Sequence, residues 1–181
     1  MNDVLVIGGG PSGLSAALFL ARAGLKVAVV DGGRSQLLTV SRVPNYPGVL
    51  DGPSGEELLR RLKEHAERYG AEVVRGVVKE VRDMGGVFEV FLEEGGRLEG
   101  ERLLLCTHKE PTVASLLGLR RKGVFIETDE GGRTSYPRVY AAGVARGRVP
   151  GHAIVSAGDG AWVAVQLVSD LRGEAYKDHT D

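Results

Sequence analysis

The stretch Asp3-Val4-Leu5-Val6-Ile7-Gly8-Gly9-Gly10-Pro11-Ser12-Gly13 decides the fold of this 181-residue chain. The apolar run at 3–7 breaks into a glycine-rich loop, and residues 14–24 then have the composition of a helix. A second apolar run at 25–30 stops at Asp31. The order of strand, glycine loop, helix, strand and acid is typical of a dinucleotide-binding βαβ unit, which predicts an α/β fold with a parallel central sheet.

The glycines of this loop each have a physical task in holding a pyrophosphate. Gly8 allows the tight turn out of the first strand, Gly10 leaves space for the pyrophosphate beside the backbone, and Gly13 lets the helix pack closely on the strands. The helix N-terminus offers unpaired N–H groups and the positive end of its dipole. Asp31 can accept hydrogen bonds from the hydroxyls of a ribose. The motif by itself does not distinguish NAD from FAD.

Composition limits the remaining possibilities. The chain has a net charge of −1 and 43% hydrophobic residues, which indicates one globular domain with a core. Its basic residues form no stripe for nucleic acid, its apolar runs are too short to span a membrane, and no metal-ligand spacing is present. The single cysteine, Cys106, excludes an intrachain disulfide within these residues. We expect a cytoplasmic protein without a signal peptide, and the scarcity of amides suggests a thermophile.

The rest of the chain predicts further strands and helices. Ser54 and Glu57 form a capping box that opens an amphipathic helix at 56–69. The segments 72–81 (with a possible break at Gly76), 87–92 and 98–106 predict a three-stranded antiparallel meander. Residues 109–122 are expected to be irregular. Strands at 123–127 and 139–143 and a long helix at 152–171 complete the chain.

Four segments carry a likeness to a known family: the loop 8–13, Gln36-Leu37 with Asn45-Tyr46-Pro47-Gly48, the segment from Thr128 to Gly143, and Ala153 with Ala157-Gly158 and Gly160. In these segments the chain resembles the FAD-binding domain of the thioredoxin reductase family, within the pyridine nucleotide-disulphide oxidoreductase class. The resemblance implies FAD as cofactor and a Rossmann-like domain. In that family an NADPH domain with a Cys-x-x-Cys pair is inserted after the meander. Residues 108–119 stand in its place, so we expect one FAD-binding domain over 1–181 with halves at 1–107 and 120–181.

The resemblance also implies which residues bind FAD, by their position in the family's pattern. The implied cofactor-binding residues are Gly8, Gly10, Pro11, Ser12, Gly13, Asp31, Gly32, Gly33, Arg34, Gln36, Ser41, Asn45, Val78, Thr107, Gly143, Val144, His152 and Ala153. Two positions depart from the pattern. Val144 replaces an aspartate that bonds the ribityl chain, and His108 replaces a glycine next to the cofactor.

The sequence leaves several roles open. Cys106 is better explained as a small buried residue than as a redox thiol. His152 is either a helix-start residue or a proton shuttle beside the flavin, and His108 is either a loop residue or a charge near a phosphate.

At the level of function, we expect an oxidoreductase that relies on an external electron donor or redox partner protein, with no catalytic residue assigned. The alternatives are a non-catalytic FAD-binding module or subunit of a larger redox complex and, less favoured, an NAD-binding protein. A homodimer or hetero-complex is possible on an apolar face formed by Val113, Leu116, Leu117 and Leu119, unless these residues fold back onto the core.

Overall fold

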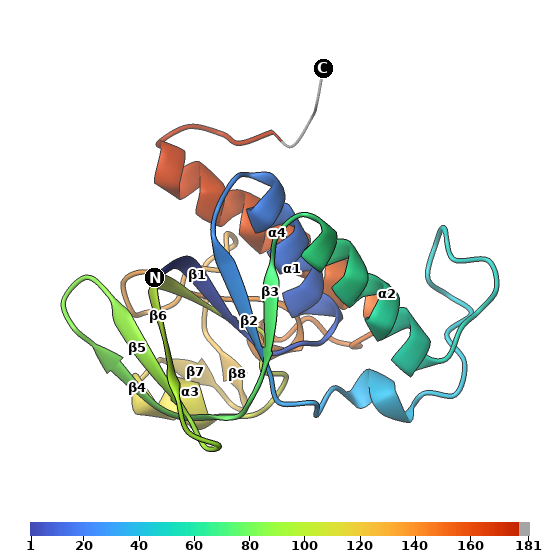
Figure 1. Ribbon diagram of the computed structural model, residues 1–181, viewed down its shortest axis with the longest axis horizontal. Helices are drawn as coiled ribbons and strands as arrows, with labels where there is room; N and C mark the ends of the chain where they lie inside the picture. Colours follow the sequence, from blue (N-terminus) through green and yellow to red (C-terminus); the bar gives the residue numbers. More distant parts are fainter. Residues whose placement is uncertain (178–181) are drawn as a thin grey trace.

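A computed structural model describes residues 1–177 and shows a central sheet with three long helices on one face (Figure 1). The sheet order is β3-β2-β1-β6-β5-β4, and β9 pairs with the end of β6. Strands β1, β2, β3, β6 and β9 are parallel, whereas β4 and β5 are antiparallel to their neighbours. The strands are β1 Asn2–Ile7, β2 Val27–Asp31, β3 Glu72–Arg75, β4 Val78–Asp83, β5 Phe88–Leu92, β6 Arg97–Leu105 and β9 Val139–Ala141.

The helices follow the expected order along the chain. The long helices are α1 Pro11–Arg22, α2 Gly55–Arg68 and α4 Ala153–Arg172; the short ones are α3 Thr112–Leu116 and the 3₁₀ turns η1 Gln36–Thr39 and η2 Gly143–Arg146. A small hairpin joins β7 Arg121–Lys122 to β8 Phe125–Ile126. The predicted cap of α2 is confirmed, because the N–H of Glu57 donates to the Ser54 hydroxyl at 3.2 Å.

Two hydrophobic clusters lie on opposite faces of the sheet, as the alternation of side chains along a strand requires. Val4 and Val6 of β1 belong to the cluster that packs against α1 and α4. Leu5 and Ile7 belong to the other cluster, which includes Phe88 of the meander. The fully apolar β1 is therefore buried on both faces, as expected for a central parallel strand.

Gly76 divides the predicted strand 72–81 into two strands that serve different parts of the sheet. β3 lies at the parallel edge beside β2, and β4 joins the antiparallel meander with β5. A side chain at position 76 would meet the Leu92 side chain, because a Cβ built there lies 2.8 Å from it. The meander is thus confirmed, with β4, β5 and β6 as its strands.

The prediction that 109–122 is irregular is wrong in part, because α3 forms there. Val113 and Leu119 are 1% and 6% exposed and pack in the core cluster with the meander. The prediction of an apolar partner-binding face is therefore wrong at these two residues. Their burial supports the alternative that the segment folds back onto the core. Leu116 remains exposed. Across residues 1–177, no helix is long and apolar enough to cross a membrane.

Candidate functional site

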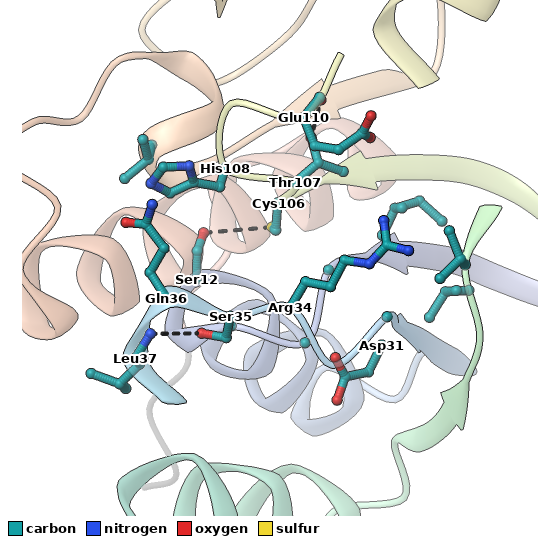
Figure 2. A pocket seen from close by; sticks show the side chains of 18 of the residues that line it. Ser12, Asp31, Arg34, Ser35, Gln36, Leu37, Cys106, Thr107, His108 and Glu110 are labelled. Atoms are coloured by element: carbon teal, nitrogen blue, oxygen red, sulfur yellow. Dashed lines mark hydrogen bonds between the residues drawn. The ribbon is translucent and has the colours of Figure 1, made fainter. Parts of the chain in front are cut away.

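A pocket of about 700 Å³ lies at the carboxyl ends of β1, β2 and β6, where the glycine loop begins (Figure 2). This edge of a parallel sheet is where open α/β folds bind their ligands. The wall combines residues from both ends of the chain. Of the residues implied by the resemblance, those that line the pocket are Gly8, Gly10, Pro11, Ser12, Asp31, Gly32, Arg34, Gln36, Val78, Thr107, Val144 and Ala153.

The glycine loop is held by close backbone contacts. Gly8 has φ of +117°, and a Cβ built there would lie 2.4 Å from the carbonyl oxygen of Cys106 on the neighbouring strand. At Gly13 the Cβ would lie 1.9 Å from the carbonyl oxygen of Gly8. Gly10 differs, since the nearest heavy atom to its Cβ is the Ser35 hydroxyl at 3.5 Å. Gly8 and Gly13 therefore serve the fold, whereas Gly10 borders open space in the pocket.

The first turn of α1 can bind an anion. Gly10 is the N-cap and provides no side-chain acceptor, and no acidic residue lies in the first turn. The backbone N–H groups at this end and the positive end of the helix dipole therefore face the pocket without a local competitor.

Asp31 ends β2 beside the glycine loop (Figure 2). One carboxylate oxygen accepts a hydrogen bond from the N–H of Gly33 at 2.8 Å. Its Cγ lies 2.3 Å from where a Cβ of residue 9 would be, so only glycine at position 9 lets the carboxylate approach the loop. The second oxygen remains available for a ribose hydroxyl.

Arg34 extends into the pocket above Asp31, on the side of the strand end that carries Cys106 and Thr107 (Figure 2). Over residues 1–177 no salt bridge is found for its guanidinium. Backbone hydrogen bonds hold the pKa of Glu94 below the usual range, and the more distant charge of Arg34 adds to this effect. An unpaired guanidinium here suits a phosphate group.

Cys106 lies under the glycine loop and accepts a hydrogen bond from the Ser12 hydroxyl at 3.5 Å (Figure 2). Burial raises the pKa of its thiol to about 12. A thiol that stays protonated at neutral pH is a poor nucleophile, which favours the structural interpretation of this residue.

His108 occupies the left-handed region with φ of +56°, a conformation that a glycine adopts without strain. Its side chain lines the pocket and points toward Gln36 (Figure 2). Burial and the neighbouring Lys109 lower the pKa of His108, which favours the neutral imidazole. The structure thus brings His108 into the pocket as a neutral hydrogen-bonding group.

Six of the implied residues lie outside the pocket wall. Gly13 packs against Gly8 beneath the loop, and Gly143 packs against Ser12. Gly33 borders a small neighbouring cavity of about 220 Å³. The exposed residues Ser41, Asn45 and His152 are not among the lining side chains.

Further residues line the wall beyond those implied as cofactor-binding, although the sequence already placed His108 next to the cofactor. The additional wall residues are Ile7, Gly9, Val30, Ser35, Leu37, Thr39, Val40, Gly76, Val77, Lys79, Glu93, Cys106, His108, Glu110, Thr112, Val113, Gly151 and Ser156. Most of them neighbour an implied residue along the chain, so that proximity to the motifs was the available signal. The exceptions are the group at 110–113, which reaches the pocket because α3 folds back, and Glu93, which reaches it by pairing with Val77 through the backbone.

These residues fit FAD in two respects. The pocket is long enough to border a glycine loop, a ribose-binding acid and the N-terminal part of α4, of which Ala153 and Ser156 line it. Neither α1 nor α4 has a side-chain cap or an acidic residue in its first turn. Two helix N-termini open to the same pocket suit a cofactor with two phosphates and a ring that gains negative charge on reduction.

Comparison with known proteins identifies the family to which this chain belongs. The sequence model described as "Pyridine nucleotide-disulphide oxidoreductase" matches residues 39–160, and the one described as "FAD dependent oxidoreductase" matches residues 3–41. The thioredoxin reductase of Rickettsia felis is 37% identical over 117 residues, which cover 64% of this chain and 38% of that protein. That of Peptoclostridium acidaminophilum is 35% identical over 127 residues, which cover 67% and 40%. The chain thus spans about two fifths of the length of these relatives.

Solved structures confirm the fold. A thioredoxin reductase from Gloeobacter violaceus matches with a TM-score of 0.87 at 20% identity, covering 99% of each chain. The atypical thioredoxin reductase TRi from Desulfovibrio vulgaris Hildenborough matches with a TM-score of 0.83 at 19% identity, covering 98% of this chain and all of the other. The matched family models describe FAD-dependent domains, and FAD is the cofactor of this one. The chain belongs to the pyridine nucleotide-disulphide oxidoreductase family, in which it is a thioredoxin reductase-like FAD-binding domain.

Proposed function

We propose that this domain is a flavin-dependent oxidoreductase that receives its electrons from a donor outside these 181 residues. The observation that carries the proposal is the pocket, whose wall joins the glycine loop, Asp31, Arg34 and the start of α4. The sequence contains this one glycine fingerprint and one cysteine. It therefore offers a site for the flavin but no second site for a nicotinamide and no dithiol.

The binding roles follow from the chemistry of the wall. The N–H groups at the start of α1 and the guanidinium of Arg34 bind the pyrophosphate, and Asp31 binds the adenosine ribose. Val78 and its neighbours enclose the adenine end, and Val144 with Ala153 encloses the other end. The bound flavin supplies the electron transfer, while the protein positions it and sets its electrostatic surroundings.

We propose further that residues 108–119 replace the inserted domain of longer relatives, with 1–107 and 120–181 as the two halves of a single FAD-binding domain. The family match supports this division, because its range of 39–160 includes parts of both halves and the segment between them. The burial of Val113 and Leu119 supports it as well, since the segment closes the core on its own.

The routes by which electrons reach and leave the flavin are limited by the groups that these residues lack. A lone buried thiol cannot form the dithiol–disulfide pair through which electrons would leave the flavin for another disulfide. Because these residues hold no second glycine fingerprint for a nicotinamide, we propose that reduced nicotinamide or a small redox protein reaches the flavin from solution. Thioredoxin reductases among the relatives support a redox partner of this kind.

The decisive experiment is an anaerobic reduction of the FAD-loaded protein, followed by visible absorption. We expect a yellow protein. Its visible flavin absorption should be bleached by NADH, NADPH or a reduced flavodoxin-type protein, with dithionite as the chemical control. Bleaching by dithionite alone would instead favour the non-catalytic FAD-binding module. A colourless protein that takes up NAD but not FAD would overturn the proposal.

A further inference from the structure

A buried carboxylate on α4 holds the turn that follows β9. The N–H of Gly143 donates to Asp159 Oδ2 at 2.7 Å. Arg146 donates to both carboxylate oxygens, with Nε 2.8 Å from Oδ2 and a terminal nitrogen 2.6 Å from Oδ1. The side chains of Arg146 and Asp159 are only 2% and 8% exposed.

The charge of Asp159 is retained despite its burial. Burial alone would raise the pKa of this carboxyl, but the hydrogen bonds from Arg146 and from the N–H of Gly143 hold it below its usual range. The Nε of the half-exposed Arg148 adds a third donor at 2.9 Å. These bonds restrict the buried ion pair to a narrow range of geometries, because a shift of either side chain would break charge-assisted hydrogen bonds.

Arg146 extends the same network to a third segment of chain. Its remaining terminal nitrogen donates to the carbonyl oxygens of Asp129 and Glu130, each at 3.1 Å. The pair therefore ties together the η2 turn, α4 and the loop before β9.

This network sits directly behind the pocket wall. Val144, next to Gly143 in the turn, lines the pocket. Gly143 has φ of +67°, and a Cβ built there would lie 2.8 Å from the Ser12 side chain. Gly160 follows Asp159 in α4, and its Cβ would lie 2.1 Å from the Ser12 carbonyl oxygen. α4 and the first turn of α1 thus touch at their backbones, and the η2 turn packs closely against the Ser12 side chain.

We propose that Asp159 is a positioning residue for FAD. By fixing the η2 turn against α4 and Ser12, it sets the distance between the wall at Val144 and the phosphate-binding start of α1. The carboxylate that the resemblance implies directly after Gly143 is absent there, and α4 brings one to the same turn from sixteen residues further along the chain. The inference rests on the proposed FAD binding.

Two variants test this role, Asp159→Asn and the double variant Asp159→Leu with Arg146→Met. The double variant replaces the whole ion pair by apolar side chains and so leaves no buried charge unpaired. For both we expect the Kd for FAD, measured by fluorescence, to rise at least about tenfold. We also expect the visible circular dichroism of the bound flavin to change, which reports its surroundings rather than its affinity.

Asp170→Asn is the matched control, because Asp170 is an ion-paired carboxylate on the same helix that bonds Arg133 and Tyr140 and lies outside the pocket wall. It should lower the melting temperature and leave the Kd for FAD within about twofold. A folded Asp159 variant with an unchanged Kd for FAD and an unchanged dichroism would overturn the inference. Failure of both Asp159 variants to fold would also overturn it, because the pair would then have a structural role. Wild-type protein that does not bind FAD would overturn the proposed function instead.

Discussion

At Gly10 and Gly13, two glycines of one loop meet different surroundings, which separates their effects on folding and on binding. The Cβ of an alanine at position 10 would lie 3.5 Å from its nearest neighbour, whereas at position 13 it would lie 1.9 Å from a carbonyl oxygen. We expect Gly10→Ala to fold with a melting temperature within about 5 °C of wild type, since an N-cap change of this kind costs about 1 kcal/mol or less. Its Kd for FAD should rise at least about tenfold, because the methyl group takes the space beside the pyrophosphate.

Gly13→Ala serves as the contrasting variant. It should lose most of its folded population, because no flexible atom can move aside to admit the methyl group. Circular dichroism melting of both apoproteins, with FAD titration of the folded one, measures the two effects. Unchanged FAD affinity in Gly10→Ala would show that the phosphates bind elsewhere.

The thiol of Cys106 gives a second prediction at this scale. Because burial raises its pKa to about 12, hardly any thiolate exists at pH 8. In the native protein we expect no reaction with a chromogenic disulfide reagent over about an hour. In urea we expect one thiol per chain to react. Cys106→Ser should keep the flavin spectrum of wild type. Rapid labelling of the native protein would reopen a redox role.

Among the elements, α4 is fastened to the sheet by ionic contacts at its C-terminal end. Arg133 and the Tyr140 hydroxyl of β9 both donate to Asp170, and the bonds from Arg133 hold the pKa of Asp170 below its usual range. A carboxyl with a lowered pKa in the fold stabilises the protein above the ordinary carboxyl range, and this contribution is lost as the pH falls through the folded pKa.

We therefore expect the melting temperature to fall as the pH drops below about 4, where the unfolded chain begins to bind the proton. In Asp170→Asn the melting temperature at pH 7 should already be lower, and its decline with acid should be shallower. Melting curves at a series of pH values for both proteins provide the measurement. Parallel acid profiles would assign the loss to other carboxyls.

The elements also show where prediction from sequence succeeds and where it stops. The β1-α1-β2 unit, α2 and the meander were predictable because periodicity, capping residues and glycines act locally. The possible break at Gly76 is confirmed by the division into β3 and β4, but its physical reason, the Leu92 side chain, lies in another strand. Likewise, α3 forms because Val113 and Leu119 find a place in the core, a tertiary effect that local composition does not contain.

The candidate site follows the same division. Residues near the glycine fingerprint reach the pocket as the motif implies, whereas His152 and Asn45 do not line it. The Asp159–Arg146 pair was not predicted, because it depends on how α4 is turned about its axis relative to η2. Only the packed structure determines that orientation, through the contacts of Gly160 and Gly143 with Ser12.

For the whole molecule, the pocket links roughly the first thirty residues to the last helix, since its wall includes the glycine loop as well as Val144 and Ala153. A ligand that contacts both parts stabilises the whole fold. At an FAD concentration one hundredfold above the Kd, the stabilisation is about 2.7 kcal/mol, which corresponds to a rise in melting temperature of roughly 5–10 °C for a chain of this size.

ADP allows the two ends of the pocket to be separated. It carries the adenine, ribose and pyrophosphate that suit Asp31 and the glycine loop, but nothing that reaches Val144 or Ala153. At equal concentrations we expect ADP to raise the melting temperature less than FAD does, because it leaves the wall formed by η2 and α4 without a partner. Differential scanning fluorimetry with ADP, FAD and NAD measures the three shifts. Equal shifts for ADP and FAD would mean that the flavin half of the cofactor lies outside the pocket, and the molecule would then bind a nucleotide without enclosing its reactive ring.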